Sequence, residues 1–165
     1  MRIVVSGTHA SGKSTLISDF HAAHPEYTVL GDPFDDVESG APTGAASFVA
    51  QLRVTVSRLR ESARESSVIS ERGPVDFLAY LTALEMLGRG DGALLSRAQE
   101  LVETSMAHID LIAVVPLDLR HPIDIPDDED PALREAMESA LMDALDDLER
   151  AGGCLLYTSP SPRDS

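Results

Sequence analysis

A glycine-rich segment near the start of the chain limits what this sequence can fold into more than any other feature. Residues 7–14 read GTHASGKS, a complete GxxxxGK[ST] pattern. The apolar, β-branched residues 3–5 precede it, and residues 14–17 open a helical pattern directly after it. Strand, glycine loop and helix therefore follow one another in the order that a phosphate-binding loop requires.

The residues of this loop have distinct expected roles. Gly7 and Gly12 let the backbone turn so that successive N–H groups point at phosphate oxygens. Lys13 is the only lysine among 13 basic residues, and its compact ammonium can reach the β- and γ-phosphates of a nucleotide. Ser14 would place its hydroxyl on Mg²⁺. We expect ATP and Mg²⁺ as cofactors, with the nucleotide bound by Gly7, Ala10, Ser11, Gly12, Lys13, Ser14 and Thr15.

Composition narrows the class of protein. The chain has 28 acidic against 13 basic residues, a net charge of −15, which would repel a nucleic-acid backbone. Its 43% of hydrophobic residues are enough for a buried core, and no apolar stretch approaches the roughly 20 residues that span a bilayer. We expect a cytoplasmic protein with ATP and a small-molecule acceptor as partners, without nucleic acid or membrane. A homodimer is left open.

Three other nucleotide-binding classes are disfavoured. A GTPase reads guanine with Asn-Lys-x-Asp, which needs a second lysine that the chain lacks. An AAA+ machine needs a helical lid domain for which the chain is too short, and an ABC subunit needs a Leu-Ser-Gly-Gly-Gln signature that is absent.

The last residues have a separate interpretation. Residues 154–164 resemble the translation of a transposase adapter used in DNA library preparation. We therefore expect a domain over residues 1–153, cut short at about Gly153, and an adapter-derived tail over residues 154–165. The alternative is a natural, disordered tail rich in Ser and Pro.

Hydrophobic patterning predicts alternating strands and helices in a three-layer α/β fold, with a parallel sheet between helices. Strands are expected at 27–30, 67–70 and 111–115 in addition to the first, and helices at 14–23, 45–65, 75–87, 93–107 and 131–152. The last helix should lead to one more strand, which the adapter has replaced or shortened. Residues 34–44 predict a surface loop, and the acidic run at 127–130 is either a solvated face or a metal site.

Three motifs together resemble a known family. GTHASGKST follows the first strand, VLGDP at 29–33 closes the second, and SERGPVD at 70–76 closes the third. They are similar to motifs of the P-loop kinase-like ATPases related to nicotinamide riboside kinase domains and deoxynucleoside kinases. The resemblance implies a P-loop NTPase fold with strand order 2-3-1-4-5.

The resemblance also implies catalytic residues beside Lys13. Asp32, followed by proline, corresponds to a general base that accepts a proton from the substrate hydroxyl; a turn initiator is the alternative. Glu71 would lie near Mg²⁺, directly or through a water, and Arg72 near the transferred phosphate, unless the two form a surface salt bridge. Arg120 and Arg134 fall where such kinases carry lid arginines that close over phosphates.

Other residues keep two interpretations. Asp76 either orients a substrate hydroxyl or places a favourable charge at a helix N-terminus. The segment with Phe48 and Gln51 is similar to the one with which nucleoside kinases hold the base, although a Phe at helical spacing favours the core. The expected function is transfer of the ATP γ-phosphate to a nucleoside-like metabolite. An ATP-dependent switch without an acceptor is the alternative.

Overall fold

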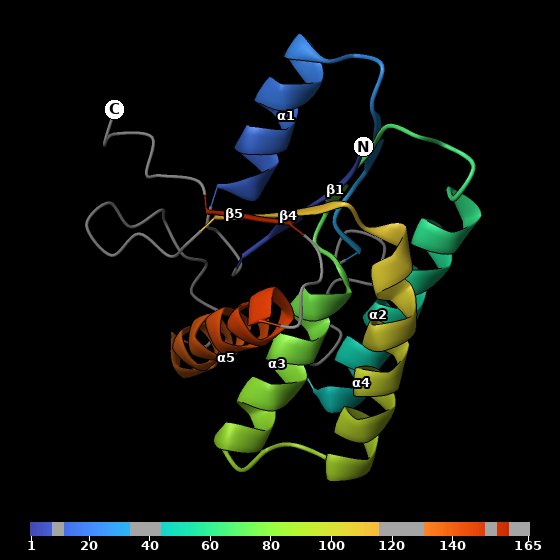
Figure 1. Ribbon diagram of the computed structural model, residues 1–165. Helices are drawn as coiled ribbons and strands as arrows, with labels where there is room; N and C mark the ends of the chain where they lie inside the picture. The colour runs from blue at the N-terminus through green and yellow to red at the C-terminus, as the bar shows by residue number, and fades with distance from the viewer. Residues whose placement is uncertain (8–11, 34–43, 116–130, 151–154, 159–165) are drawn as a thin grey trace.

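The computed structural model describes residues 1–7, 12–33, 44–115, 131–150 and 155–158 (Figure 1). Five strands and six helices lie within these ranges. The elements in chain order are β1 (Arg2–Ser6), α1 (Lys13–Ala23), β2 (Thr28–Leu30), α2 (Ala45–Glu61), β3 (Val68–Glu71), α3 (Pro74–Met86), α4 (Gly92–Ser105), the 3₁₀ turn η2 (Met106–His108), β4 (Leu111–Val114), α5 (Pro131–Arg150) and β5 (Leu155–Thr158).

The strands form one parallel sheet in the order β2-β3-β1-β4-β5, which confirms the expected order 2-3-1-4-5. β1 is the central strand: its Val5 pairs with Glu71 of β3, and its Ser6 pairs with Val114 of β4. Because all the strands run the same way, their carboxyl ends meet at one edge of the sheet. The segments that follow β1, β2 and β3 therefore begin close together.

Helices cover the two faces of the sheet unequally. In Figure 1, α1 lies on one face, and α2, α3, α4 and α5 lie on the other. The alternation of side chains along β1 matches this arrangement, because Ile3 and Val5 pack with Ile17 of α1 whereas Val4 belongs to the larger cluster under the other helices. The continuous apolar run of β4 is explained in the same way: Ile112 and Ala113 contribute to opposite faces.

α3 lies in the middle of the four-helix layer and is buried on most of its surface. It contacts α2, α4 and α5. α5 packs on it with the residues spaced by four that the sequence predicts, namely Leu133, Met137, Leu141 and Leu145. This packing holds the start of α3 firmly at the carboxyl edge of the sheet.

α2 ends at Glu61, four residues earlier than expected, and Ala63, beyond its end, is exposed. The reason is a side chain from another element. The guanidinium group of Arg2 in β1 donates to the carbonyl oxygens of Leu59 at 2.7 Å, Ser62 at 2.7 Å and Glu65 at 3.0 Å. These bonds satisfy carbonyls that a continuing helix would otherwise use, so the helix stops there.

The last strand is present but short, in line with the expectation that residues of the tail replace or shorten it. Residues 155–158 form β5 and pair in parallel with all four residues of β4, from Leu111 with Leu155 to Val114 with Thr158. The sequence LLYT contains residue types that favour strands, and the free edge of β4 offers unpaired backbone groups for such a segment. The adapter origin of residues 154–165 stays a prediction, since strand pairing does not depend on where a segment comes from.

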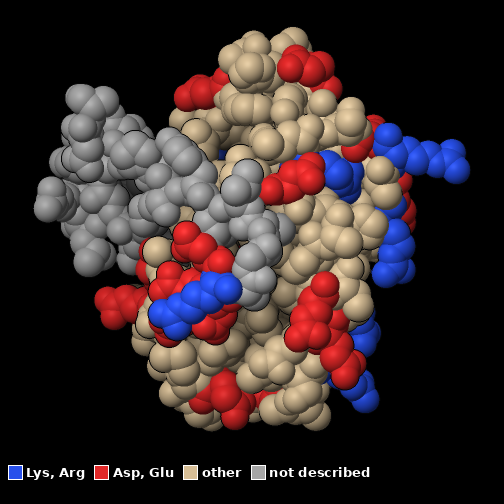
Figure 2. All heavy atoms as spheres, in the orientation of Figure 1, with Lys and Arg blue, Asp and Glu red and all other residues tan. Residues whose placement is uncertain are grey.

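Several expectations fall outside the described residues: the loop at 34–43, the irregular acidic segment at 116–130 and most of the tail. Acidic side chains are spread over the face seen in Figure 2, in line with the net charge of −15. None of the helices in the described ranges is long and apolar enough to cross a membrane.

Candidate functional site

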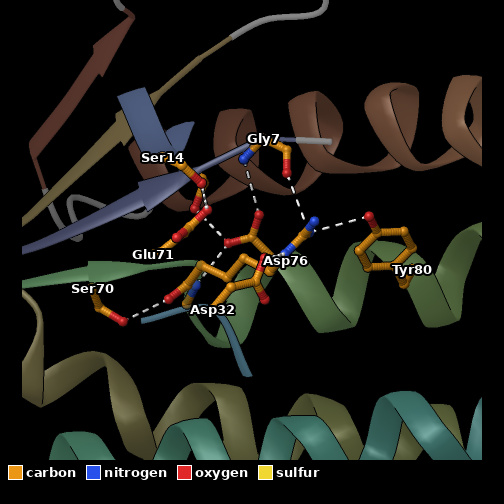
Figure 3. A network of polar contacts seen from close by, with 10 residues as sticks. Gly7, Ser14, Asp32, Ser70, Glu71, Asp76 and Tyr80 are labelled. Atoms are coloured by element: carbon orange, nitrogen blue, oxygen red, sulfur yellow. Dashed lines mark hydrogen bonds and ion pairs between the residues drawn. The ribbon is translucent and has the colours of Figure 1, made fainter. Parts of the chain in front are cut away.

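The carboxyl edge of the sheet brings together side chains that are far apart in the sequence. Gly7 follows β1, Asp32 follows β2, and Arg72 follows β3. In open parallel α/β sheets this edge is where ligands bind. Figure 3 shows the polar contacts that join these segments.

The N-terminus of α1 faces this edge with its backbone uncapped. Gly12 is its N-cap residue and has φ 93°, a left-handed conformation that glycine adopts without strain. Among the described residues, no side chain forms a capping hydrogen bond there, and the first turn holds no acidic residue. The first N–H groups of α1 and the positive end of its dipole therefore suit an anion.

Lys13, in the first turn of α1, is only 3% exposed. Burial, and then the charge of Arg72, lower the pKa of Lys13 from 10.5 to about 7, although the surrounding carboxylates act in the opposite direction. An ammonium in this position is stabilised by added negative charge. A bound phosphate group would supply it.

Ser14 and Glu71 are in contact. The Ser14 hydroxyl donates to Oε1 of Glu71 at 2.6 Å, which joins the start of α1 to the end of β3. A hydroxyl and a carboxylate oxygen are the hard donors that Mg²⁺ takes in nucleotide sites, where phosphates and waters complete its shell. The donor set therefore fits Mg²⁺. Within the described ranges, no group of three or more His, Cys, Asp or Glu side chains forms a metal cluster.

Arg72 is fully buried and lies at the centre of the network. Its Nε–H donates to Oδ2 of Asp32 at 3.1 Å, and its Nη1 donates to the Tyr80 hydroxyl at 3.1 Å and to the Gly7 carbonyl at 3.4 Å. Burial by itself lowers the pKa of Arg72, but Tyr80, Asp32 and Asp76 raise it by more, so the pKa lies above its ordinary value. Arg72 is thus a permanent cation next to the phosphate loop.

The backbone of Arg72 is strained. Its φ of 70° is in the left-handed region, which costs a residue with a side chain about 1–3 kcal/mol. Two hydrogen bonds hold it there: its N–H donates to the Val5 carbonyl at 2.9 Å, and its carbonyl accepts from the Ser70 hydroxyl at 2.8 Å. The Arg72 side chain is buried and pairs with Asp32, so it does not form the surface salt bridge with Glu71 that the sequence left open.

Asp76 is fully buried in the first turn of α3. Its Oδ1 accepts from the Gly7 N–H at 3.0 Å, and its Oδ2 accepts from the Ser6 hydroxyl at 2.7 Å and the Gly73 N–H at 2.8 Å. Burial raises the pKa of Asp76, against the lowering effects of Arg72 and of these hydrogen bonds. Asp76 therefore lies at the helix N-terminus as one alternative from the sequence had it, since it accepts from Gly73, the N-cap residue of α3; its contacts with Gly7 and Ser6 were not expected.

An aromatic pair lies next to Arg72. The Arg72 guanidinium carbon is 5.3 Å from the centre of the Tyr80 ring, and the Phe48 ring stacks on Tyr80 at 4.5 Å with an angle of 7°. One helical turn after Phe48, Gln51 is 1% exposed, and its side-chain oxygen has no hydrogen-bond partner among the described residues. Tyr80 was missed from the sequence, because an apolar helix face gave no reason to single it out.

The other site residues expected from the sequence, where the structure describes them, do not take part in the contacts described above. Thr15 is exposed on α1, and Arg134 is buried in the first turn of α5. Ala10, Ser11 and Arg120 lie outside the described residues, so their expected roles stay predictions.

Solved structures of three proteins resemble this fold. A deoxyadenosine kinase from M. mycoides with dCMP and dCDP bound matches with a TM-score of 0.71 at 10% identity, over 97% of this chain and 90% of that chain. The NadR protein in complex with NR matches with a TM-score of 0.70 at 14% identity, over 99% of this chain but 46% of that chain. A thymidylate kinase from Candida albicans matches with a TM-score of 0.57 at 15% identity, over 94% and 82%.

No protein-family model matches the chain, and no curated protein matches it in sequence. At identities of 10 to 15% the likeness concerns the fold alone. The three-layer α/β fold with strand order 2-3-1-4-5, expected from the resemblance of the three motifs, is confirmed.

Proposed function

We propose that the chain is a small-molecule kinase that transfers the γ-phosphoryl group of ATP to a hydroxyl group of a nucleoside-like metabolite. One observation carries the proposal: the buried guanidinium of Arg72 contacts both the Gly7 carbonyl of the phosphate loop and the carboxylate of Asp32. A cation beside the phosphate loop and a carboxylate next to it are the groups that phosphoryl transfer to a hydroxyl requires.

The chemistry assigns one role to each group. Asp32 takes up the proton of the substrate hydroxyl. The oxygen of that hydroxyl forms a bond to the γ-phosphorus, and the bond from the γ-phosphorus to the ADP oxygen breaks. Arg72 and Lys13 stabilise the negative charge on the phosphoryl oxygens. Ser14 and Glu71 would hold Mg²⁺, Glu71 directly or through a water, and the metal supplies further neutralisation of the phosphates.

The proposed acceptor class rests on the aromatic pair and Gln51. Phe48 and Tyr80 stack on each other beside Arg72 and are 1% and 5% exposed, so a flat nucleobase would pack against the edge of this aromatic pair. The side-chain oxygen of Gln51 is buried without a partner among the described residues, a costly state that an N–H group of a base would relieve. A polymer acceptor is disfavoured by the net charge of −15.

An ADP-release assay tests the proposal. The purified chain is given Mg·ATP alone and then with single nucleosides, nucleoside monophosphates and vitamin-like ribosides. The kinase is supported if one of these acceptors raises ADP release at least tenfold and the phosphorylated acceptor is found by mass spectrometry. ADP release that no acceptor changes would instead support the ATP-dependent switch, and absence of ATP binding would contradict both.

A further inference from the structure

One carboxylate joins the two loops on which the proposed chemistry depends. Asp76 accepts hydrogen bonds from Gly7, the first residue of the phosphate loop, and from Gly73, the residue after Arg72. The Ser6 hydroxyl donates to the same carboxylate from the end of β1. The side chain is fully buried, so water does not compete for these three donors.

A second feature keeps the turn after Arg72 pressed against the central strand. A Cβ atom on Gly73 would come within 2.4 Å of the Val4 side chain. Gly73 is therefore in close contact with β1, and only glycine allows this approach. Together with Asp76 it fixes the distance between the phosphate loop and the segment that carries Glu71 and Arg72.

We propose that Asp76 is a positioning residue that holds Gly7, where the phosphate loop begins, in a fixed position relative to Arg72, without touching nucleotide or acceptor itself. This inference rests on the proposed function, in which the loop binds a triphosphate. Asp76 lies at the N-terminus of α3. Because α3 is buried and contacts α2, α4 and α5, the position of the Asp76 carboxylate is fixed.

A simple capping role for Asp76 predicts a different result. As an N-terminal charge and cap of α3, Asp76 would contribute to stability but would leave ATP affinity unchanged in any variant that stays folded. As a positioning residue, Asp76 would contribute to both stability and ATP affinity. The two roles are therefore separated by comparing ATP affinity between variants of equal stability.

The experiment uses the full chain with D76N, S6A and the control V102A. Asparagine keeps one acceptor oxygen, and the orientation that satisfies Ser6 and Gly73 turns its NH₂ group toward the Gly7 N–H, so that contact is lost. V102A removes buried methyl groups from α4 in the same core cluster, away from the loop. Urea unfolding ranks the stability of the variants, and calorimetry with ATP and Mg²⁺ gives the affinity.

We expect D76N to weaken ATP binding about tenfold or more, the effect of losing one hydrogen bond to a charged group, and S6A to weaken it about threefold. V102A should bind ATP like the wild type at a similar loss of stability. The amide-proton resonance of Gly7 should move upfield in D76N and stay in place in V102A, because a hydrogen bond to a carboxylate shifts that proton downfield.

Affinities for D76N and V102A within a factor of two, or an unmoved Gly7 resonance, would overturn the inference. If D76N does not fold, S6A decides, since ATP affinity equal to that of V102A would also overturn it. If the wild type binds no ATP, the proposed function fails, and with it the nucleotide-binding role inferred for Asp76. The Gly7 resonance then still reports whether the hydrogen bond from the Gly7 N–H to Asp76 exists.

Discussion

Arg72 and Asp32 form a buried ion pair at 3.1 Å across two neighbouring strands, with the arginine side chain entirely inaccessible to solvent. Burying either charge alone would cost free energy, and in the pair each charge compensates the other. The pair places a cation and a carboxylate at one point of the sheet edge, close to Gly7. The first prediction concerns this carboxylate.

Replacing Asp32 with Asn should lower kcat for acceptor phosphorylation by about 10²- to 10⁴-fold, the usual contribution of a general base, with little change in ATP affinity. The amide cannot take up the proton but can still accept a hydrogen bond from Arg72. Steady-state kinetics and calorimetry measure the two quantities. D110N, which removes a carboxylate that accepts the Arg2 N–H, is the matched control. Equal turnover by D32N and D110N would make Asp32 a structural residue only.

Lys13→Ala should abolish ATP binding while the protein stays folded. Loss of the ammonium removes the side-chain charge expected to contact the phosphates, and it also relieves the cost of keeping a lysine that is only 3% exposed. Calorimetry and thermal unfolding check the two halves of this prediction. Unchanged nucleotide affinity in the variant would contradict it.

The lowered pKa of Lys13, about 7 against 10.5 in the unfolded chain, makes stability depend on pH. Between these values the unfolded chain holds a proton that the native protein has released, so this group makes the free energy of unfolding increase as pH rises from 7 to 10.5. Urea unfolding over this range should show that slope in the wild type and lose it in K13M. The same slope in both proteins would refute the assignment.

Nucleotide binding should reverse this shift. Phosphate oxygens next to Lys13 raise its pKa, so above pH 7 the complex takes up a proton on binding and ATP affinity falls as pH rises. Calorimetry at pH 8 in two buffers of different ionisation enthalpy measures the uptake. A binding enthalpy that is independent of the buffer would argue against it.

Tyr80→Phe should lower kcat about tenfold with a small effect on stability. The variant keeps the ring that stacks on Phe48 but removes the hydroxyl that accepts from Nη1 of Arg72, leaving the guanidinium less well positioned. Kinetics and urea unfolding on the same preparation test this. A loss of stability as large as the loss of activity would indicate a packing role instead.

Arg2→Met should destabilise the fold by about 1–3 kcal/mol, because the carbonyls at the end of α2 lose their charged donor. The stability of R2K should lie between those of the wild type and R2M, since lysine supplies fewer hydrogen-bond donors than arginine. R97M, on the exposed face of α4, is the control and should change stability by no more than about 0.5 kcal/mol. Urea unfolding of the three variants decides, and an R2M effect no larger than that of R97M would contradict the capping role.

Local sequence determined much of this protein. Residues 3–17 predict a strand, a loop and a helix from neighbouring side chains alone, and the four-residue repeat of α5 indicates its buried face. The strand order followed from the resemblance of three short motifs, each at the end of a parallel strand. These features depend on residues close together in the chain, which is why they could be predicted from it.

Tertiary structure decided the rest. The end of α2 depends on Arg2, more than fifty residues earlier, and β5 forms because the edge of β4 is free to pair. The contacts of Arg72 with Asp32 and Tyr80, and of Asp76 with Gly7, exist only once the sheet has brought three loops to one edge and excluded water from them. A sequence records which charges are present, but which of them are buried together depends on the packing of the whole chain.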